Sequence, residues 1–147
     1  MAGTAELERF FREVAGLDVD KADVQRFRTF VDEKVDDIAI AARDAARWNG
    51  RDVIAPQDLP LTKGLQERIR EFGKLDVADE FRAMLRGSLR RPPDDVTFGE
   101  ETEDSLTDVF GGLGVALARS FRILDPDVRN PSAQHWDRAF ELLRLTV

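Results

Sequence analysis

Residues 20–59 read DKADVQRFRTFVDEKVDDIAIAARDAARWNGRDVIAPQDL, and this stretch decides the fold. From Asp20 to Asn49 it holds no proline or glycine, and apolar residues recur at steps of three or four: Val24, Phe27, Val31, Val35, Ile38, Ala42 and Ala45. This spacing predicts one amphipathic helix of roughly 40–45 Å at about 1.5 Å per residue. Such a helix far exceeds the usual length of about 11 to 12 residues, so it needs neighbours along both of its halves.

The segments around this helix predict the same plan twice, a short helix, a long helix and a short helix. Gly50 ends the first long helix, and an extended strap should follow at 52–55. Asn130 and Pro131 predict the cap of the last helix. We expect further helices over 5–14, 61–72, 77–89, 100–124 and 133–145. The halves 1–75 and 76–147 lack a long polar linker between them, which favours a single compact domain.

The composition limits the function. The chain has 147 residues, no cysteine, one histidine and a net charge of -7. Thiolate and histidine metal sites are therefore not expected, nor is a cofactor. No segment has the length and hydropathy of a membrane span or the pattern of a signal peptide, so we expect a cytoplasmic protein. The negative charge disfavours nonspecific attraction to nucleic acid or anionic membranes.

The order of elements carries a resemblance to a known fold. The Ala15-Gly16 pair before the long helix, and the strap from Gly50 to Ile54 after it, resemble the archaeal histone pattern. In that family a strap arginine pairs with an aspartate seven residues later, and Arg51 and Asp58 have this spacing. The whole chain resembles a bacterial family of unknown function in which two histone folds are fused in one polypeptide.

The resemblance implies an all-α protein built from tandem histone folds that clasp as an intramolecular pseudodimer. The two long helices would cross near their middles, where small residues permit close approach. Candidates for this crossing are Ala39, Ala42, Gly111, Gly112 and Gly114. A phosphate-binding role for the glycines is disfavoured because no strand precedes them and no Lys-Ser/Thr follows, whereas a helix kink or bulge stays open.

Arg51 and Asp58 admit three interpretations. The first is a bidentate pair that pins the strap to the next helix. The others are a phosphate contact by Arg51 and a solvated surface pair.

The resemblance also implies two edges where histones bind DNA. One edge would join 50–55 to 90–98, and the other would join 17–21 to 125–129. The positions at which the family contacts phosphates hold Asp18, Asp52 and Val53 in this chain. Carboxylates there repel phosphate, so neither edge matches a strong DNA-binding histone.

Two arginine rows favour DNA binding instead. Arg82, Arg86 and Arg90 follow one another at steps of four residues, Arg91 comes next, and a second row contains Arg43, Arg47 and Arg51. Both rows would lead to one edge of a clasped pseudodimer. They are either solvated helix faces or a single nucleic-acid-binding edge.

Catalysis is not expected. The acidic pairs are adjacent in sequence, so a helix would point their members to different faces. His135 shares one exposed turn with Ser132 and Asp137, without the concave site that a catalytic triad needs.

Two functions from different classes follow. The first is a nucleoid-associated protein that binds duplex DNA weakly through its arginine-rich edge. The second is a protein-interaction scaffold that has lost DNA binding. In either case we expect a monomer, because the fusion supplies the dimer partner within the chain.

Overall fold

The computed structural model describes residues 3–86 and 96–147, and within them the chain forms six α-helices, one 3-10 turn and two short strands. The elements are α1 (Thr4–Ala15), α2 (Lys21–Trp48), β1 (Val53–Ile54), η1 (Pro56–Asp58), α3 (Lys63–Gly73), α4 (Ala78–Arg86), β2 (Thr97–Phe98), α5 (Glu100–Leu124) and α6 (Ala133–Thr146). The predicted mostly helical fold is confirmed. Positions 87–89 of the predicted fourth helix lie outside the described residues.

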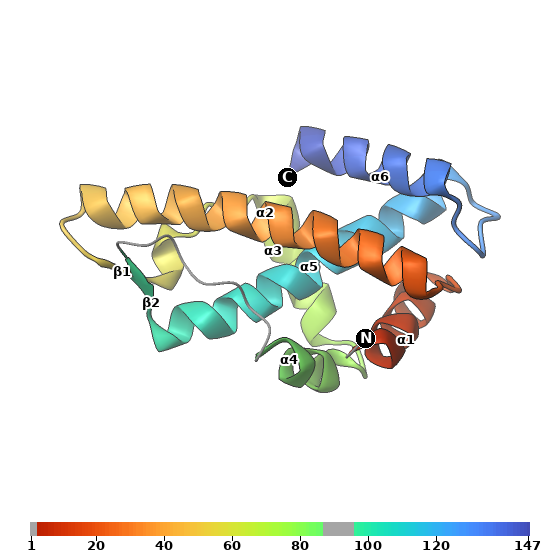
Figure 1. The fold of residues 1–147 in the computed structure, drawn as a ribbon, viewed down its shortest axis with the longest axis horizontal. Helices are drawn as coiled ribbons and strands as arrows, with labels where there is room; N and C mark the ends of the chain where they lie inside the picture. The colour runs from red at the N-terminus through yellow and green to blue at the C-terminus, as the bar shows by residue number, and fades with distance from the viewer. Residues whose placement is uncertain (1–2, 87–95) are drawn as a thin grey trace.

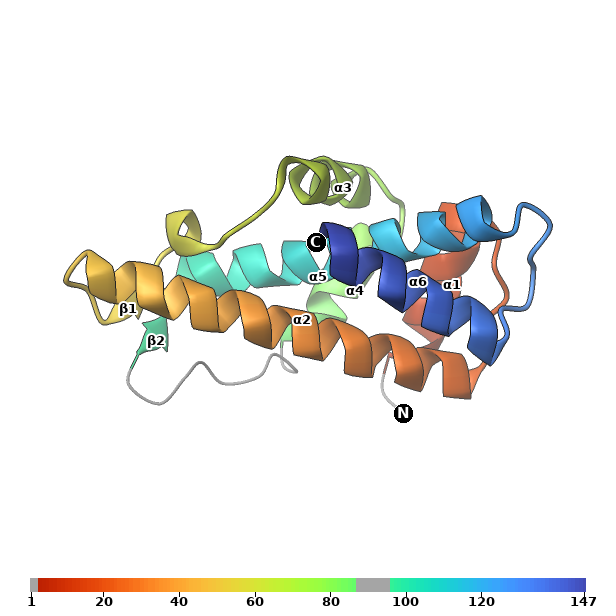
Figure 2. The ribbon, with the colours of Figure 1, turned by 90° about the horizontal axis from the view of Figure 1, so that it is seen from above.

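Helix α5 is the central element of the fold. It contacts α1, α2, α3, α4 and α6, and Figures 1 and 2 show it running through the middle of the molecule, alongside α2. Every residue from Val109 to Val115 is buried. A helix that is buried on all sides must be apolar all round, which is what this stretch of sequence provides.

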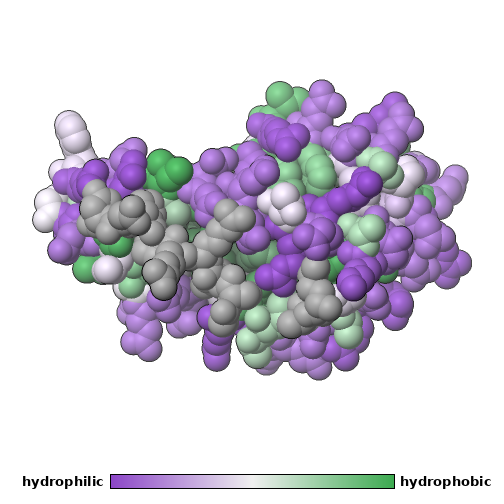
Figure 3. Space-filling view, in the orientation of Figure 1, coloured by the Kyte–Doolittle hydropathy of each residue, from purple (hydrophilic) through white to green (hydrophobic). Residues whose placement is uncertain are grey.

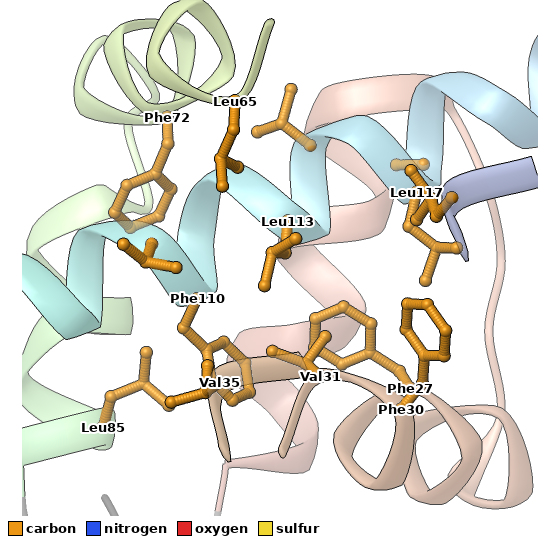
Figure 4. Close-up of a cluster of buried hydrophobic side chains, with 14 of the residues drawn as sticks. Phe27, Phe30, Val31, Val35, Leu65, Phe72, Leu85, Phe110, Leu113 and Leu117 are labelled. Carbon is orange, nitrogen blue, oxygen red and sulfur yellow. The ribbon is translucent and has the colours of Figure 1, made fainter. Parts of the chain in front are cut away.

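The hydrophobic core lies between the two long helices and extends under α3. Phe27, Val31 and Val35 project from α2 toward Phe110 and Leu113 of α5, as Figure 4 shows. Leu65 and Phe72 reach the opposite side of α5 from α3. Neither long helix can bury its stripe alone, so the two halves share one core.

Backbone pairing joins the halves at both ends of the molecule. β1 and β2 pair in parallel, with Val53 opposite Thr97 and Ile54 opposite Phe98. Thr102 at the start of α5 adds a buried side-chain bond to the carbonyl of Ile54 at 2.5 Å. At the other end the Asp18 amide donates to the Arg129 carbonyl at 2.7 Å.

The start of α2 is fixed by a buried carboxylate. Asp20 caps the helix by accepting from the Asp23 amide at 2.8 Å, and the Asp23 side chain accepts from the Asp20 amide at 3.0 Å. The second Asp23 oxygen accepts the indole N–H of Trp136 at 2.7 Å. Burial, the largest cause, raises the pKa of Asp23. The capping box therefore also ties α2 to α6.

The cap of α6 differs from the sequence prediction. Ser132, not Asn130, is the N-cap, and its side chain accepts from the His135 amide at 3.4 Å. The His135 side chain in turn accepts from the Ser132 amide, so the two residues form a capping box. Histidine stands at the position that glutamate or glutamine usually occupies in this motif.

Two of the three glycines of α5 face a different helix from the one that the predicted crossing of the long helices requires. A Cβ on Gly111 would lie 2.4 Å from Phe72, and one on Gly112 would lie 2.6 Å from Ile69. Both neighbours belong to α3, so these two glycines let α3, not α2, approach α5. Gly114 alone of the three faces α2, where a Cβ would meet Phe27 at 3.2 Å and Phe10 of α1 at 2.8 Å. Ala39 and Ala42 are buried on α2.

Candidate functional site

The strap edge, which we define as the end of α2, strands β1 and β2, and the start of α5, contains the Arg51–Asp58 pair. The Arg51 guanidinium donates two parallel hydrogen bonds to the Asp58 carboxylate, at 2.8 and 2.7 Å, and a third to the Val53 carbonyl at 3.1 Å. Asp58 also accepts from the Ala55 amide at 2.8 Å. The Asp58 side chain is only 3% exposed. Arg51 thus uses these hydrogen-bond donors to hold the strap in place.

Charge pairing explains the protonation state of this carboxylate. The hydrogen bonds from Arg51, more than any other cause, hold the pKa of Asp58 below its usual value. The pair therefore stabilises the fold at neutral pH, and this stabilisation is lost as the pH falls through the lowered pKa.

Replacing Asp58 by alanine should lower the melting temperature more than replacing both Arg51 and Asp58, because the single change leaves a guanidinium without its partner. The difference between the wild type and Asp58→Ala should shrink in acid. Thermal denaturation followed by circular dichroism at neutral and acid pH measures both effects. Asp52→Ala removes an exposed carboxylate from the same strap and should change little. An unchanged melting temperature for Asp58→Ala would contradict the structural role of the pair.

Arg82 also binds groups within the protein. Its Nε donates to Asp108 at 2.8 Å, its Nη1 donates to Asp79 at 3.2 Å, and its guanidinium lies 5.2 Å from the centre of the Phe72 ring. The bond to Asp108 is the largest cause that raises the pKa of Arg82. This arginine links α4 to α5 and α3, and its charge is balanced inside the molecule.

Two of the other predicted arginines of α2 and α4, Arg86 and Arg43, lie near acids. Arg86 lines a hollow of about 410 Å³ with Glu100, Glu103 and Asp104 of α5. Arg43 contacts Asp44 at 3.3 Å, and Arg47 is exposed in the last turn of α2. The predictions for Arg90 and Arg91 fall outside the described residues.

The opposite end of the molecule is also charge-balanced. Asp18 contacts Arg12 at 3.6 Å and Arg129 at 3.4 Å. The carboxylate that the sequence places at this edge is thus paired with two arginines where the two loops meet.

His135 is partnered by a carboxylate that the sequence analysis did not single out for this role. Its Nε2 lies 2.9 Å from Asp125, and its Nδ1 accepts from the Ser132 amide at 3.0 Å. The Ser132 hydroxyl lies 2.9 Å from the same Nδ1. Hydrogen bonding to His135, the largest cause, lowers the pKa of Asp125.

These contacts form a helix cap with a loop tether. The Ser132 amide occupies the lone pair of Nδ1, so the ring proton belongs on Nε2, where it binds Asp125. The Ser132 hydroxyl already serves as the N-cap acceptor. The predicted turn of Ser132 and His135 is present, but Asp125 supplies the carboxylate, not Asp137.

The surface carries a few large apolar side chains among mainly hydrophilic groups, as one face in Figure 3 illustrates. Trp48 is 87% exposed at the end of α2, and Val53 is 42% exposed in β1. At the other half, Ile123 and Leu145 are 75% and 81% exposed. Tryptophan is enriched among the residues that contribute most to binding at protein interfaces.

A groove that the sequence did not predict lies between α3, α5 and α6. It has a volume of about 330 Å³ and is lined by Leu65, Arg68, Ala116, Arg119, Ile123 and Leu143, among others. These residues belong to three separate helices, and only the docking of α3 and α6 on α5 brings them together.

Among the residues that the structure describes, no group of three or more histidine, cysteine or acidic side chains is placed to hold a metal ion. The described helices include none that is long and apolar enough to cross a membrane.

Comparison with known proteins places the chain in a family. Residues 7–144 match the family described as a domain of unknown function, DUF1931, and the chain belongs to that family. An uncharacterized protein of Aquifex aeolicus is 30% identical over 111 residues, which cover 76% of this chain and 65% of that protein. The chain therefore spans slightly less than two thirds of this relative's length.

Solved structures share the whole fold. A crystal structure from Thermus thermophilus matches with a TM-score of 0.86 and 41% identity over 97% of both chains. A crystal structure of an Aquifex aeolicus protein matches with a TM-score of 0.83 and 26% identity, covering 99% of this chain and 96% of that chain.

Proposed function

We propose that the protein is a histone-fold pseudodimer that works as a non-enzymatic protein-interaction module. The fold assignment is supported by the repeated short, long, short order of helices. It is supported further by the parallel pairing of β1 with β2, which joins the loop after one long helix to the loop before the other. The Arg51–Asp58 pair at the family's spacing is a third support.

The observation that carries the functional proposal is that arginines of both rows bind carboxylates of the protein itself. Arg51 and Arg82, one from each row, are both bound to carboxylates within the protein, and Arg86 faces acids of α5. Each internal carboxylate weakens an arginine's attraction for phosphate, and DNA binding depends on many such contacts for counterion release. These pairings disfavour DNA binding by the described arginines of the two rows.

The strap edge offers apolar surface. Trp48 ends α2, and Val53 lies in the strand that follows. A large rigid aromatic ring loses little conformational entropy on binding, and burying it in a partner yields more than any surface ion pair. A protein partner is the class of molecule that such a surface suits.

The DNA alternative is tested by titrating salt against duplex DNA with the purified chain. We expect no retention of DNA even at about 50 mM salt, where electrostatic binding is strongest. Retention that falls steeply with salt, and is lost when Arg86→Glu is combined with Arg90→Glu, would overturn this proposal in favour of a nucleoid role.

The protein-interaction role is tested by site-specific photocrosslinking in cells of the source organism. A photoreactive phenylalanine at position 48 should give discrete protein adducts. The matched control is the same residue at position 22, since Ala22 is exposed at the opposite end of the same helix. Equal adduct patterns at both positions would contradict a partner site at Trp48.

A further inference from the structure

We propose that the groove between α3, α5 and α6 binds a small amphipathic carboxylate, an acyl or aryl chain with one acid group. The carboxylate would bind Arg68 and Arg119, and the chain would lie on the apolar wall. This binding activity goes beyond the interaction role proposed above.

The size of the groove suits a small molecule. Its volume of about 330 Å³ lies in the range of ligand pockets, about 300 to 1,000 Å³. Leu65 and Leu143, which are 2% and 4% exposed, belong to its lining, and Ile123 contributes an apolar side chain that is 75% exposed. An apolar chain lying in the groove would cover Ile123.

The charged side chains that face the groove favour an anionic group over a cationic one. The charged side chains among its lining residues are two arginines, Arg68 of α3 and Arg119 of α5. Arg119 donates to Glu71 at 2.6 Å, and Arg68 contacts the same Glu71 oxygen at 3.3 Å. Glu71 thus holds the two guanidinium groups side by side, so their positions are set before a ligand arrives.

Arg68 has hydrogen-bond donors to spare. Its Nε is buried and meets no acceptor within residues 3–86 and 96–147. Its Nη2 makes only long contacts, at 3.3 Å to Glu71 and 3.5 Å to Glu67. The Arg68 side chain is 28% exposed, so a carboxylate in the groove could take bonds from the accessible part of this guanidinium in place of the long contacts.

Two of the three hydroxyl groups in the groove lining have their donors occupied. Ser120 donates to the Ala116 carbonyl at 2.7 Å, and Thr146 donates to the Leu142 carbonyl at 3.1 Å. The third, Thr62, accepts from the Leu65 amide at 3.1 Å. The arginines are the charged donors of the lining, and charge-assisted bonds to a carboxylate are the stronger ones.

Calorimetric titration of the full chain with three eight-carbon probes tests the proposal: octanoate, octan-1-ol and octylammonium, each below the concentration at which it self-associates. Octanoate should bind saturably at one site, at least tenfold more tightly than octan-1-ol, with no binding of octylammonium. Equal affinity for octanoate and octan-1-ol, or absence of saturation by octanoate, would overturn the proposal.

Two variants locate the site. Arg68→Gln with Arg119→Gln should weaken octanoate binding at least tenfold. Ala116→Leu should block it by filling the groove without changing any charge. Arg138→Gln is the matched control, because Arg138 lies beside His135 in a separate hollow. Circular dichroism checks that each variant is folded, and unchanged octanoate binding in folded Ala116→Leu would refute the assignment.

Discussion

Replacing Gly111 by alanine is expected to destabilise the protein by at least about 2 kcal/mol, although alanine is the better helix former. The added Cβ would lie 2.4–2.5 Å from three atoms of the Phe72 ring. That ring is fully buried against Phe10 and Phe81, so it cannot move away without disturbing the aromatic core. Urea denaturation followed by circular dichroism measures the loss.

Gly64 provides the matched control for this substitution. It lies in the first turn of α3, and a Cβ added there meets no atom within 4 Å among those described. Gly64→Ala should therefore be neutral or stabilise by up to about 1 kcal/mol. Adding Phe72→Leu to Gly111→Ala should recover part of the loss, since the smaller side chain makes room. If Gly111→Ala is as harmless as Gly64→Ala, α3 does not pack on α5 as described.

Replacing Trp136 by alanine should cost about 3–5 kcal/mol, the range for removing a large buried aromatic side chain. Trp136 is fully buried, and its ring packs edge-on against Phe121 at 4.7 Å and Phe11 at 5.9 Å between ring centroids. It is the anchor of α6 on both long helices, because its indole N–H binds Asp23 of α2 while its ring contacts α5. A loss below about 1 kcal/mol would contradict this position.

The conservative variant Trp136→Phe separates the hydrogen bond from the packing. It leaves one oxygen of the buried Asp23 carboxylate without its donor, at a cost of about 1–3 kcal/mol. Since the indole bond lowers the pKa of Asp23, its loss should raise that pKa further. The raised folded-state pKa penalises the ionised form, so the cost of Trp136→Phe should be largest at neutral pH and shrink as the pH falls toward 4. A cost that does not depend on pH would show that the carboxylate is not involved.

The local predictions from the sequence rest on short-range physics. The stripe of α2, the absence of glycine and proline and the capping aspartates act within a few residues of one another, and the helix forms where they indicate. The predicted bounds of 100–124 agree with α5, and those of 61–72 fall close to α3 at Lys63–Gly73. Arg51 and Asp58 are seven residues apart, so one strap and one turn suffice to bring them together.

The partners of the predicted site residues are distant in sequence, and several of them differ from those that the sequence suggested. Arg82 looked like a member of an exposed row, but Asp108 arrives from α5 to bind it. His135 has Asp137 as its sequence neighbour, yet Asp125 across the loop is its partner. Gly111 faces Phe72, 39 positions earlier in the chain, and periodicity within α5 cannot identify which helix covers a given face.

The sequence by itself determined which segments are helices and that the two halves follow the same plan, because propensity and apolar periodicity are local properties. The tertiary structure alone decided that the middle of α5, from Val109 to Val115, is buried on every side, that arginines of both predicted rows pair with carboxylates, and that three helices line a groove with two guanidinium groups. Those features depend on contacts between residues that are distant in sequence. Residue spacing along the chain cannot predict them, because the contacts form only when the helices pack.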